Sequence, residues 1–489
     1  MAHGVEAIIG LEVHVQLRTR TKLFCACRNA YGAEPNSLTC PVCLGLPGAL
    51  PVLNGEAVRQ GLALGLALGA RRQPVSTFYR KQYVYPDLPK GYQITQGPVA
   101  LVEGGTLEIP ADPLVRGGGG TLRAGIERAH LEEDAGKSLH GDGRTRVDLN
   151  RAGVPLLEIV GAPDLRSPQE ASDYLKALHR LVVFLGICDG NLEEGSFRCD
   201  ANVSLRPAGS DAFGTRVEIK NLNSFRFVKQ SLAFEIRRQT GLLERGEPVI
   251  PETRGWDAAA GETRAQRTKE AAMDYRFFPE PDLPPLGLDP GEVEAVRRML
   301  PELPEARIRR YRERLGVSEE DARTLMQSPA FADYFEALAG ASGDGRAAAR
   351  WMLGEVSRVL NERGILIQAF SLEPAALGAL VRLVLEGKVA LGAAREEVFP
   401  ALLAGEGPAD AIVRQRGLGR VPADPVRLEA LVRQVLAAHP EAVAQIRAGR
   451  DRLRGFLVGQ ILKAGGGALD PKAVQVALDA ALPEFLAKP

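Results

Sequence analysis

Ile8-Ile9-Gly10-Leu11-Glu12-Val13-His14-Val15-Gln16-Leu17 is the stretch that decides the fold. Its apolar and polar residues alternate with the two-residue period of a β-strand. One face is aliphatic and is expected to pack on a core, while the other carries Glu12, His14 and Gln16. A carboxylate and an imidazole two positions apart can reach one cation, although a solvated face would carry similar residues. The stretch therefore predicts a half-buried strand and leaves both readings of its polar face open.

The composition is that of a soluble globular protein. The chain has 489 residues, 45% hydrophobic and 25% charged, with a formal net charge of zero. A chain of this length exceeds one ordinary core, so roughly two to four domains are expected. Balanced charge means that any surface for nucleic acid must be local. We find neither a secretory signal nor an apolar run long enough for a membrane span, so we expect a cytoplasmic protein without a membrane partner.

We expect an α+β protein with a mixed or antiparallel β-sheet in an N-terminal catalytic domain, followed by a helical domain and a small all-α tail domain. After Pro284-Pro285 strand-like residues give way to alanine, leucine, arginine and glutamate with helical periodicity. A second break falls at Gly405-Glu-Gly-Pro408. The predicted domains are residues 1–291, 292–405 and 406–489.

Two helices of the first domain can be placed from local signals. Between Asn54 and Leu68 apolar residues are interleaved with glycine and alanine, as in a helix that packs closely against its neighbours. Ser167-Pro-Gln-Glu170 predicts a helix start with a capping box and proline at the first helical position. An apolar stripe of helical period then continues until Gly186. Both helices are expected to be scaffold.

Four of the six cysteines form two close pairs separated by a loop. Such a spacing can place four thiolates tetrahedrally around Zn²⁺. We find no histidine or carboxylate in the cluster to activate water, so a structural zinc is expected. Two surface disulfides are the alternative, which a reducing cytoplasm disfavours. The predicted zinc ligands are Cys25, Cys27, Cys40 and Cys43.

Two further acidic positions could supply metal ligands. The segment Leu131-Glu-Glu-Asp-Ala-Gly-Lys-Ser138 suggests a phosphate loop, but leucine stands where its first glycine would have to be. What remains is an acidic turn that is either solvated or metal-binding. Glu158 lies between Leu157 and Ile159 in an apolar strand, where an unpaired carboxylate would be costly. Glu158 therefore needs a cation or a basic partner.

Three stretches could bind phosphates, a base or other parts of a substrate, and a solvated edge is the alternative for each. Residues 80–92 alternate bases with tyrosines and are broken by prolines, which predicts a strand running into a constrained loop. Residues 198–206 and 217–225 predict an antiparallel strand pair with a polar platform facing Glu12 and His14. The candidate contacts are Lys81, Tyr83, Tyr85, Lys90, Arg198, Asp200, Asn202, Lys220, Asn221 and Asn223.

The C-terminal tail carries basic residues around the apolar run Phe456-Leu-Val458. A basic helix on a neutral protein is typical of a local surface for RNA backbone. A solvated helical face is the alternative. The candidate RNA contacts are Arg447, Arg450, Arg452, Arg454 and Lys463.

Seven motifs follow one another along the chain: Gly10-Leu-Glu-Val-His14, Tyr83-Val-Tyr-Pro-Asp87, Leu131-Glu-Glu-Asp-Ala-Gly-Lys-Ser138, Asp148-Leu-Asn-Arg151, Arg198-Cys-Asp-Ala-Asn202, Lys220-Asn-Leu-Asn-Ser224 and Asp274-Tyr-Arg-Phe-Phe-Pro-Glu-Pro-Asp282. With these motifs the chain resembles the B subunit of the aspartyl/glutamyl-tRNA amidotransferases. The likeness runs through the whole chain and ends in Gly455-Phe-Leu-Val-Gly-Gln-Ile-Leu-Lys463. Many members of that family, though not all, have the cysteine quartet, so it supports structure rather than chemistry.

The resemblance implies a two-step reaction on misacylated Glu-tRNA(Gln), Asp-tRNA(Asn) or both. ATP phosphorylates the side-chain carboxylate of the tRNA-bound amino acid, and ammonia then displaces the phosphate to give the amide. The implied partners are a glutaminase (A) subunit that supplies ammonia through a channel and a small C subunit that braces the pair. The sequence does not distinguish which misacylated tRNA is used.

Carboxyl activation by ATP needs a hard divalent cation to neutralise the transferring phosphate. We therefore predict a catalytic Mg²⁺ or Mn²⁺ site, for which three carboxylates and one imidazole are suited. The sequence leaves the role of Glu132 open. The alternatives are a non-catalytic tRNA-binding adaptor with structural zinc, and a zinc-dependent hydrolase, which the closed cysteine cluster disfavours. The predicted catalytic and metal-binding residues are Glu12, His14, Glu133 and Glu158.

Overall fold

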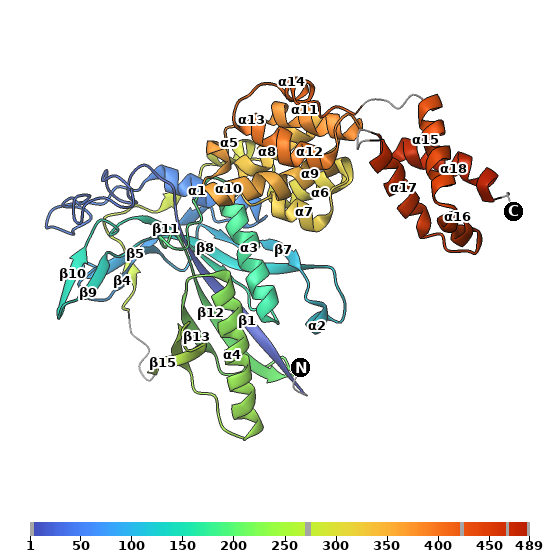
Figure 1. Ribbon diagram of the computed structural model, residues 1–489. Helices are drawn as coiled ribbons and strands as arrows, with labels where there is room; N and C mark the ends of the chain where they lie inside the picture. The colour runs from blue at the N-terminus through green and yellow to red at the C-terminus, as the bar shows by residue number, and fades with distance from the viewer. Residues whose placement is uncertain (1–3, 269–274, 421–424, 466–468, 487–489) are drawn as a thin grey trace. The chain divides into compact units, whose positions relative to one another are not determined.

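The chain divides into two structural units, Met1–Arg307 and Ile308–Pro489, each treated by itself below. The structure is a computed structural model that describes residues 4–268, 275–420, 425–465 and 469–486, so Asp274 of the seventh motif lies outside the described residues. The first unit contains the large sheet and the second is helical, which confirms the α+β class (Figure 1). The domain boundaries at residues 291 and 405 stay predictions.

The described part of the first unit contains seventeen strands and five helices. The strands are β1 Val5–Gln16, β2 Arg71–Arg72, β3 Val75–Ser76, β4 Phe78–Gln82, β5 Tyr92–Gln96, β6 Val102–Glu103, β7 Thr106–Pro110, β8 Thr121–Glu133, β9 Lys137–Gly141, β10 Arg144–Asp148, β11 Pro155–Gly161, β12 Phe197–Pro207, β13 Val217–Leu222, β14 Glu252–Asp257, β15 Glu262–Thr268, β16 Phe278–Pro279 and β17 Leu286–Gly287. The helices are α1 Gly55–Ala67, α2 Pro113–Arg116, α3 Pro168–Phe184, α4 Phe225–Glu244 and α5 Pro290–Met299.

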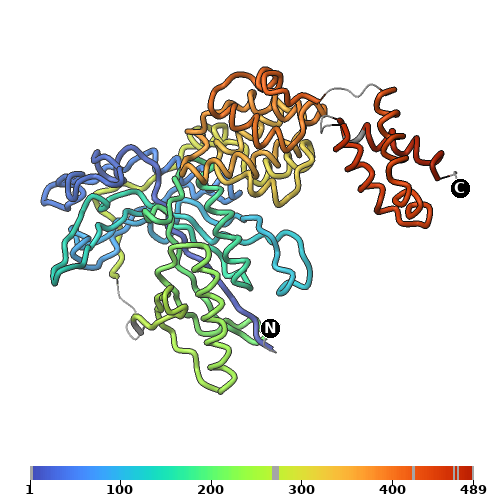
Figure 2. The backbone as a smooth tube through the Cα atoms, in the orientation of Figure 1, coloured from blue at the N-terminus to red at the C-terminus, as the bar shows by residue number. Residues whose placement is uncertain are grey.

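Strand β1 lies inside the main sheet, where the predicted strand was expected. Among the described residues the path of that sheet is β15-β14-β13-β12-β1-β11-β8-β5-β4-β16. Its neighbours run antiparallel, except that β13 and β14 are parallel, so the sheet is mixed. β1 pairs with β12 on one side and with β11 on the other. Figure 2 traces its course from the N-terminus through the sheet.

Helices α1, α3 and α4 cover one face of this sheet. The aliphatic residues of β1, including Ile9, Val13 and Val15, are buried in one core with apolar residues of all three helices. Figure 1 shows α3 and α4 side by side across the strands. The side chain of Ser167 accepts a hydrogen bond from the backbone of Glu170 at the start of α3, as the capping sequence predicted. The other face of β1 is left for polar residues.

Helix α1 packs on the sheet through its glycines. A methyl group added at Gly65 would lie 2.5 Å from Cγ1 of Val102 in β6, and one at Gly61 would lie 2.5 Å from Cδ2 of Leu101. Such distances are shorter than any normal carbon contact, so a larger residue at either position would force Val102 or Leu101 to shift. The interleaved glycines had predicted a closely packed helix, and the structure confirms it.

The second unit is helical over its described residues, apart from one isolated bridge between Val389 and Gly419. Helices α15 to α18 share a core of their own, which includes Val432, Leu457 and Leu478. None of the described helices of the chain has the length and apolar character needed to cross a membrane. The bounds, including α6 at the junction of the units, are α6 Pro304–Leu315, α7 Glu319–Leu325, α8 Pro329–Ser342, α9 Gly345–Trp351, η1 Met352–Val356, α10 Ser357–Arg363, η2 Ile367–Ala369, α11 Pro374–Leu385, α12 Leu391–Ala393, η3 Ala394–Val398, α13 Phe399–Leu403, α14 Ala409–Gln415, α15 Pro425–Ala438, α16 Pro440–Arg447, α17 Leu453–Ala464 and α18 Pro471–Leu486.

The packing of α1 can be tested with Gly65→Ala. Alanine normally favours a helix over glycine by about 1 kcal/mol. At Gly65 the added methyl must displace Val102, and overpacking of this kind costs about 1–3 kcal/mol. We expect a lower free energy of unfolding in urea. The control is Gly241→Ala in α4, where the added carbon meets only the flexible end of Arg245, at 3.3 Å, and stability should rise. Equal stabilisation by both changes would contradict the close approach.

Candidate metal centre and substrate face

The polar face of β1 brings together side chains from three neighbouring strands. In the antiparallel register His14 of β1 lies opposite Glu158 of β11, and Glu158 lies opposite His130 of β8. Residues directly opposite one another point to the same face of a sheet. Glu12 and Glu132 lie two positions from His14 and His130, so the two-residue period puts them on that face as well. The face not covered by α1, α3 and α4 therefore holds a cluster of carboxylates and imidazoles.

Nε2 of His14 lies at the middle of this cluster. It is 3.3 Å from Oε2 of Glu158, 3.4 Å from Oε1 of Glu132 and 3.9 Å from Oε1 of Glu12. Nε2 of His130 is 3.5 Å from the same oxygen of Glu158. Two overlapping sets, Glu12 with His14 and Glu158, and His130 with Glu132 and Glu158, each place possible ligand atoms within 4.8 Å of one another. Oxygen and imidazole donors this close fit a hard divalent cation.

The protonation equilibria show how strongly the cluster attracts positive charge. Burial alone would lower the pKa of His14, but its hydrogen bonds to Glu132 and Glu158 raise that pKa to about 10. Burial alone would raise the pKa of Glu158, but the hydrogen bond from His14 lowers it to about 2, and the charge of Lys81 acts in the same direction. Burial and the charge of Glu158 raise the pKa of Glu12. An imidazolium at His14 thus offsets part of the negative charge.

Glu133 lies outside this cluster. The alternation of β8 turns it to the opposite face, where its buried carboxylate pairs with Nζ of Lys90 and accepts a hydrogen bond from the backbone N–H of Ile94, at 2.9 Å. Glu132, whose role the sequence left open, lies in the position expected of Glu133. A run of two carboxylates does not reveal which one shares the face of His14, because that depends on the register with β11. Lys90 is likewise turned away from Lys81 and Tyr83.

The four predicted zinc ligands, Cys25, Cys27, Cys40 and Cys43, also converge, with their Sγ atoms within 4.8 Å of one another. All four are free thiols in the structure, which does not support the alternative of two surface disulfides. The backbone N–H of Cys40 donates to Sγ of Cys43, at 3.2 Å, and Nζ of the buried Lys22 is 3.7 Å from that sulfur. A hydrogen bond from Cys25 lowers the pKa of Cys43 to about 4 although burial opposes it. Thiolate is the metal-binding form of cysteine, so the quartet is compatible with a metal site.

Two cations lie on the β12 and β13 side of the face. Nη2 of Arg198 donates to Oδ2 of Asp134, at 2.8 Å, and Nε2 of Gln16 donates to the same oxygen, at 3.0 Å. Nζ of Lys220 donates to Oδ2 of Asp200, at 2.8 Å. Burial would lower the pKa of Lys220, but the charge of Asp200 raises it to about 12. The sequence did not single out Asp134, because a third carboxylate in an acidic run gives no sign that it is buried.

The three candidate asparagines lie along the same two strands. Asn202 of β12 is opposite Gly10 of β1 on one side and Glu218 of β13 on the other. Asn221 and Asn223 are exposed at the end of β13. Asn221 has a φ of 65°, a left-handed conformation that asparagine tolerates better than most residues. These amides thus border the cations of the face.

The β4 side carries aromatic residues. Lys81 is the next-to-last residue of β4, and its Nζ is 6.0 Å from the ring centroid of Tyr83. The ring centroids of Tyr83 and Tyr85 are 6.1 Å apart. The structure therefore brings Lys81, Tyr83 and Tyr85 together, while Lys90 belongs to the ion pair with Glu133.

The basic residues of the tail are partly neutralised within the tail. Arg454 pairs with Asp451 and with Asp479, each at 3.2 Å. Nη2 of Arg447 donates to the carbonyl oxygen of Phe485, and Nη1 of Arg450 donates to Oε1 of Gln445. Arg452 and Lys463, at the two ends of α17, are exposed. Arg447 and Arg450 are exposed as well, so four of the five basic residues present positive charge to solvent.

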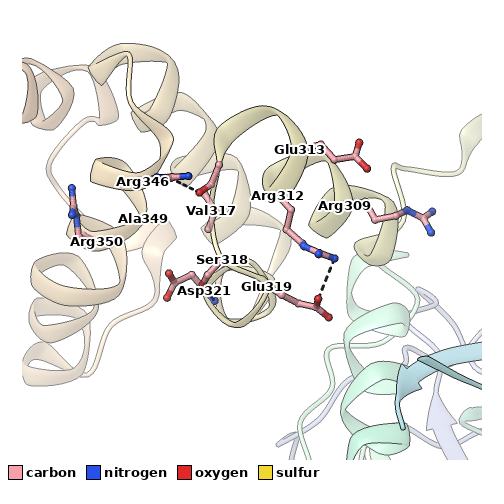
Figure 3. Close-up of a pocket in the computed structure, with 11 residues that line it drawn as sticks. Arg309, Arg312, Glu313, Val317, Ser318, Glu319, Asp321, Arg346, Ala349 and Arg350 are labelled. Carbon is pink, nitrogen blue, oxygen red and sulfur yellow. Dashed lines mark hydrogen bonds and ion pairs between the residues drawn. The ribbon is translucent and has the colours of Figure 1, made fainter. Parts of the chain in front are cut away.

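The second unit has a surface cavity of about 810 Å³ (Figure 3). Its lining mixes arginines, among them Arg346 and Arg350, with acidic residues, among them Asp321. Arg312 pairs with Glu319, at 3.1 Å, and Nε of Arg346 donates to the carbonyl oxygen of Gly316. The opposite charges in this lining largely balance, so the cavity is a weaker candidate than the face of the sheet.

The first unit is thus a sheet domain with a candidate metal centre on one face, and helices follow it in the chain. Comparisons with known proteins show the family to which such a chain belongs. A family described as the GatB/GatE catalytic domain matches residues 7–294, and one described as the GatB domain matches residues 333–482. The B subunit of an aspartyl/glutamyl-tRNA(Asn/Gln) amidotransferase from Halorhodospira halophila is 52% identical over 96% of this chain and 97% of its own length. Proteins with the same name from Syntrophotalea carbinolica and Thermosynechococcus vestitus are 50% and 47% identical, over 97% and 96% of this chain and 98% and 94% of their own lengths. The chain belongs to the family of aspartyl/glutamyl-tRNA(Asn/Gln) amidotransferase B subunits.

The cysteine quartet yields a prediction about stability. Cys40→Ser should lower both the bound metal content and the temperature of unfolding, because a structural metal contributes its binding free energy to folding. Elemental analysis and thermal unfolding of the purified chain would measure the two effects. Cys188→Ala removes a buried cysteine outside the quartet and should leave the metal content unchanged. A wild-type chain with four reactive thiols and no metal would contradict the site.

The imidazole of His14 yields a prediction about pH. With its pKa raised to about 10, His14 carries a proton at pH 8, and a cation can bind its nitrogen only after that proton leaves. Binding of Mn²⁺ should therefore release up to one proton at pH 8, and affinity should rise with pH until about 10. Calorimetry in two buffers of different ionisation enthalpy would measure the release. The control is His179→Gln, which changes a histidine packed against Phe197 and should leave the proton release unchanged. Tight binding without proton release would contradict the assignment of His14.

Proposed function

We propose that this chain activates the side-chain carboxylate of Glu-tRNA(Gln), Asp-tRNA(Asn) or both, using ATP, so that ammonia can convert it to the amide. The observation that carries the proposal is the convergence of Glu12, His14, Glu132 and Glu158 on one face of the sheet. We call this face, which α1, α3 and α4 do not cover, the open face. Membership of the family of amidotransferase B subunits supports it. A non-catalytic tRNA-binding adaptor is not favoured, because the matching family of the first unit is described as a catalytic domain.

The carboxylates and His14 would hold Mg²⁺ or Mn²⁺. Once bound, such an ion neutralises negative charge on the transferring phosphoryl group. The cluster geometry leads us to replace Glu133 by Glu132 in the proposed ligand set and to assign Lys90 no substrate contact, since the two pair with each other on the opposite face. The proposed metal ligands on this face are Glu12, His14, Glu132 and Glu158, with His130 beside them.

The remaining candidates divide between the two ends of the face. Lys81, Tyr83 and Tyr85 would contact ATP at the β4 end, where a cation and aromatic rings lie together. Arg198 and Lys220 would attract the phosphate or carboxylate of the substrate at the β12 and β13 end. The nearby hydrogen-bonding groups of Asp200, Asn202, Asn221 and Asn223 would orient the aminoacyl end of the tRNA.

The proposal also requires partners. Ammonia would come from a glutaminase (A) subunit, with a small C subunit completing a heterotrimer, and the designation of the relatives as B subunits supports such an assembly. The cysteine quartet would bind structural Zn²⁺, because four thiolates leave no position open for water. Arg447, Arg450, Arg452, Arg454 and Lys463 would contact the tRNA body, and all of them except Arg454 are exposed.

The proposal can be tested with Glu158→Gln in the assembled enzyme. We expect amidation to fall by more than about 100-fold, because even groups that only support a metal ligand are worth roughly 10- to 100-fold. The fold should persist, since the shape of the side chain is kept. Amide formation on both misacylated tRNAs at limiting Mg²⁺ is the measurement. Glu127→Gln removes an exposed carboxylate from β8 and should retain activity. Near-normal activity of Glu158→Gln would overturn the proposed centre.

The tail is tested by removing residues 406–489 and, more sharply, by the double change Arg452→Ala and Lys463→Ala. Each lost contact to a phosphate should weaken tRNA binding and make the slope of log K against log[salt] shallower by about 0.7–0.9. Filter binding over a range of salt concentrations measures both effects. Arg433→Ala is the matched control, because Arg433 already pairs with Glu429 and Glu484. An unchanged affinity and slope in the double variant would make the tail a solvated helical face.

A further inference from the structure

Four aromatic rings gather beside Lys81 at the β4 edge of the open face. The ring centroid of Tyr83 is 6.1 Å from that of Tyr85 and 6.2 Å from that of Tyr275, and Tyr275 is 5.9 Å from Phe277. Nζ of Lys81 lies 5.0 Å from the ring centroid of Tyr275. We call this group of five residues the aromatic ledge. Tyr275 and Phe277 reach it from a part of the chain almost 200 residues away.

Backbone contacts hold the two parts of the aromatic ledge together. The backbone N–H of Gln82 donates to the carbonyl oxygen of Tyr275, at 2.9 Å. Immediately afterwards β16 pairs with β4, with Phe278 opposite Arg80. Nε and Nη2 of Arg80 donate to both carboxylate oxygens of the buried Glu280, at 2.7 and 2.8 Å. Backbone contacts to β4 therefore hold the segment that carries Tyr275 and Phe277 both before and after Phe277.

Lys81 of the aromatic ledge lies on the same face of the sheet as the carboxylate cluster. Tyr79 of β4 is opposite Thr95 of β5, and Thr95 is opposite Glu132 of β8, so Tyr79 and Glu132 share a face. Lys81 is two residues beyond Tyr79 and therefore lies on that face too.

Two of the four rings of the aromatic ledge are exposed to solvent, while Tyr83 and Tyr275 are partly buried. Tyr85 is 58% exposed and Phe277 is 54% exposed. Ordinary core packing would bury such rings, since large apolar side chains gain free energy by leaving water. Exposed aromatic side chains next to a lysine are typical of sites where a nucleobase stacks and its phosphates meet a cation.

We propose that the aromatic ledge is a stacking site for a purine base, with Tyr275 and Phe277 as base-contacting residues beside Tyr83, Tyr85 and Lys81. The base belongs either to ATP or to the terminal adenosine of the tRNA, and both present the same adenine ring. This inference rests on the proposed function, because only a nucleotide-dependent reaction at the neighbouring carboxylates gives the ledge its ligand.

The test uses the full-length chain in the assembled complex and the double change Tyr275→Ala and Phe277→Ala. Loss of stacking should weaken binding on the order of tenfold. The conservative variant Tyr275→Phe keeps the ring and should retain affinity. Phe213→Ala removes an aromatic ring that is 67% exposed in a loop outside the aromatic ledge and should bind as the wild type does.

Two pairs of probes separate the sources of the base. ATP is compared with inorganic tripolyphosphate, which has the phosphates and no base. Intact tRNA is compared with tRNA that lacks its terminal adenosine. If the double variant loses affinity only for ATP, the ledge binds the base of the nucleotide substrate. If it loses affinity only for intact tRNA, the ledge binds the terminal adenosine. If the double variant binds each of the four probes as tightly as Phe213→Ala and the wild type do, the stacking proposal is wrong. Failure of the wild-type complex to use ATP in amidation would instead overturn the proposed function.

Discussion

The repulsion among carboxylates held on one rigid face of the sheet is the constraint on which the rest of this structure depends. Glu12, Glu132 and Glu158 all lie within 4 Å of one imidazole nitrogen, and β1 is paired on both sides, so they cannot move apart freely. Like charges at such distances are unfavourable unless positive charge lies between them. The proton on His14 supplies part of that charge, and a divalent cation would supply more. The covered face, with its aliphatic side chains and three helices, is what keeps the strands in this register.

The two faces of the sheet assign different roles to neighbouring residues of the same type. Glu132 faces the cluster, whereas Glu133 faces a buried environment where Lys90 neutralises it. Asp134 follows the last residue of β8, and its carboxylate accepts hydrogen bonds from Gln16 and Arg198. Three consecutive carboxylates therefore lie in three different environments. A buried ion pair of this kind is costly to break from one side, because the remaining charge would be left without a partner.

The sequence predicted what local periodicity can determine. The alternation in residues 8–17 located β1 and its two faces, and the capping residue Ser167 located the start of α3. It could not distinguish Glu132 from Glu133, since that choice depends on pairing with a strand more than twenty residues away. It also missed Tyr275 as a neighbour of Tyr83, with Phe277 beside Tyr275, because the two segments meet only through the fold. The domain limits and the roles of the site residues stay predictions.

A neutral chain can act on polyanions only if its charges are separated locally, and the open face shows such a separation. Lys81 lies at one end, Arg198 and Lys220 lie at the other, and the carboxylates occupy the space between. Without a cation the middle of the face repels the phosphates that its ends attract. A divalent cation bound at the proposed site would reverse this, because it would add two positive charges where the carboxylates converge. Cation and nucleotide should therefore bind cooperatively, each raising the affinity of the other by the same factor.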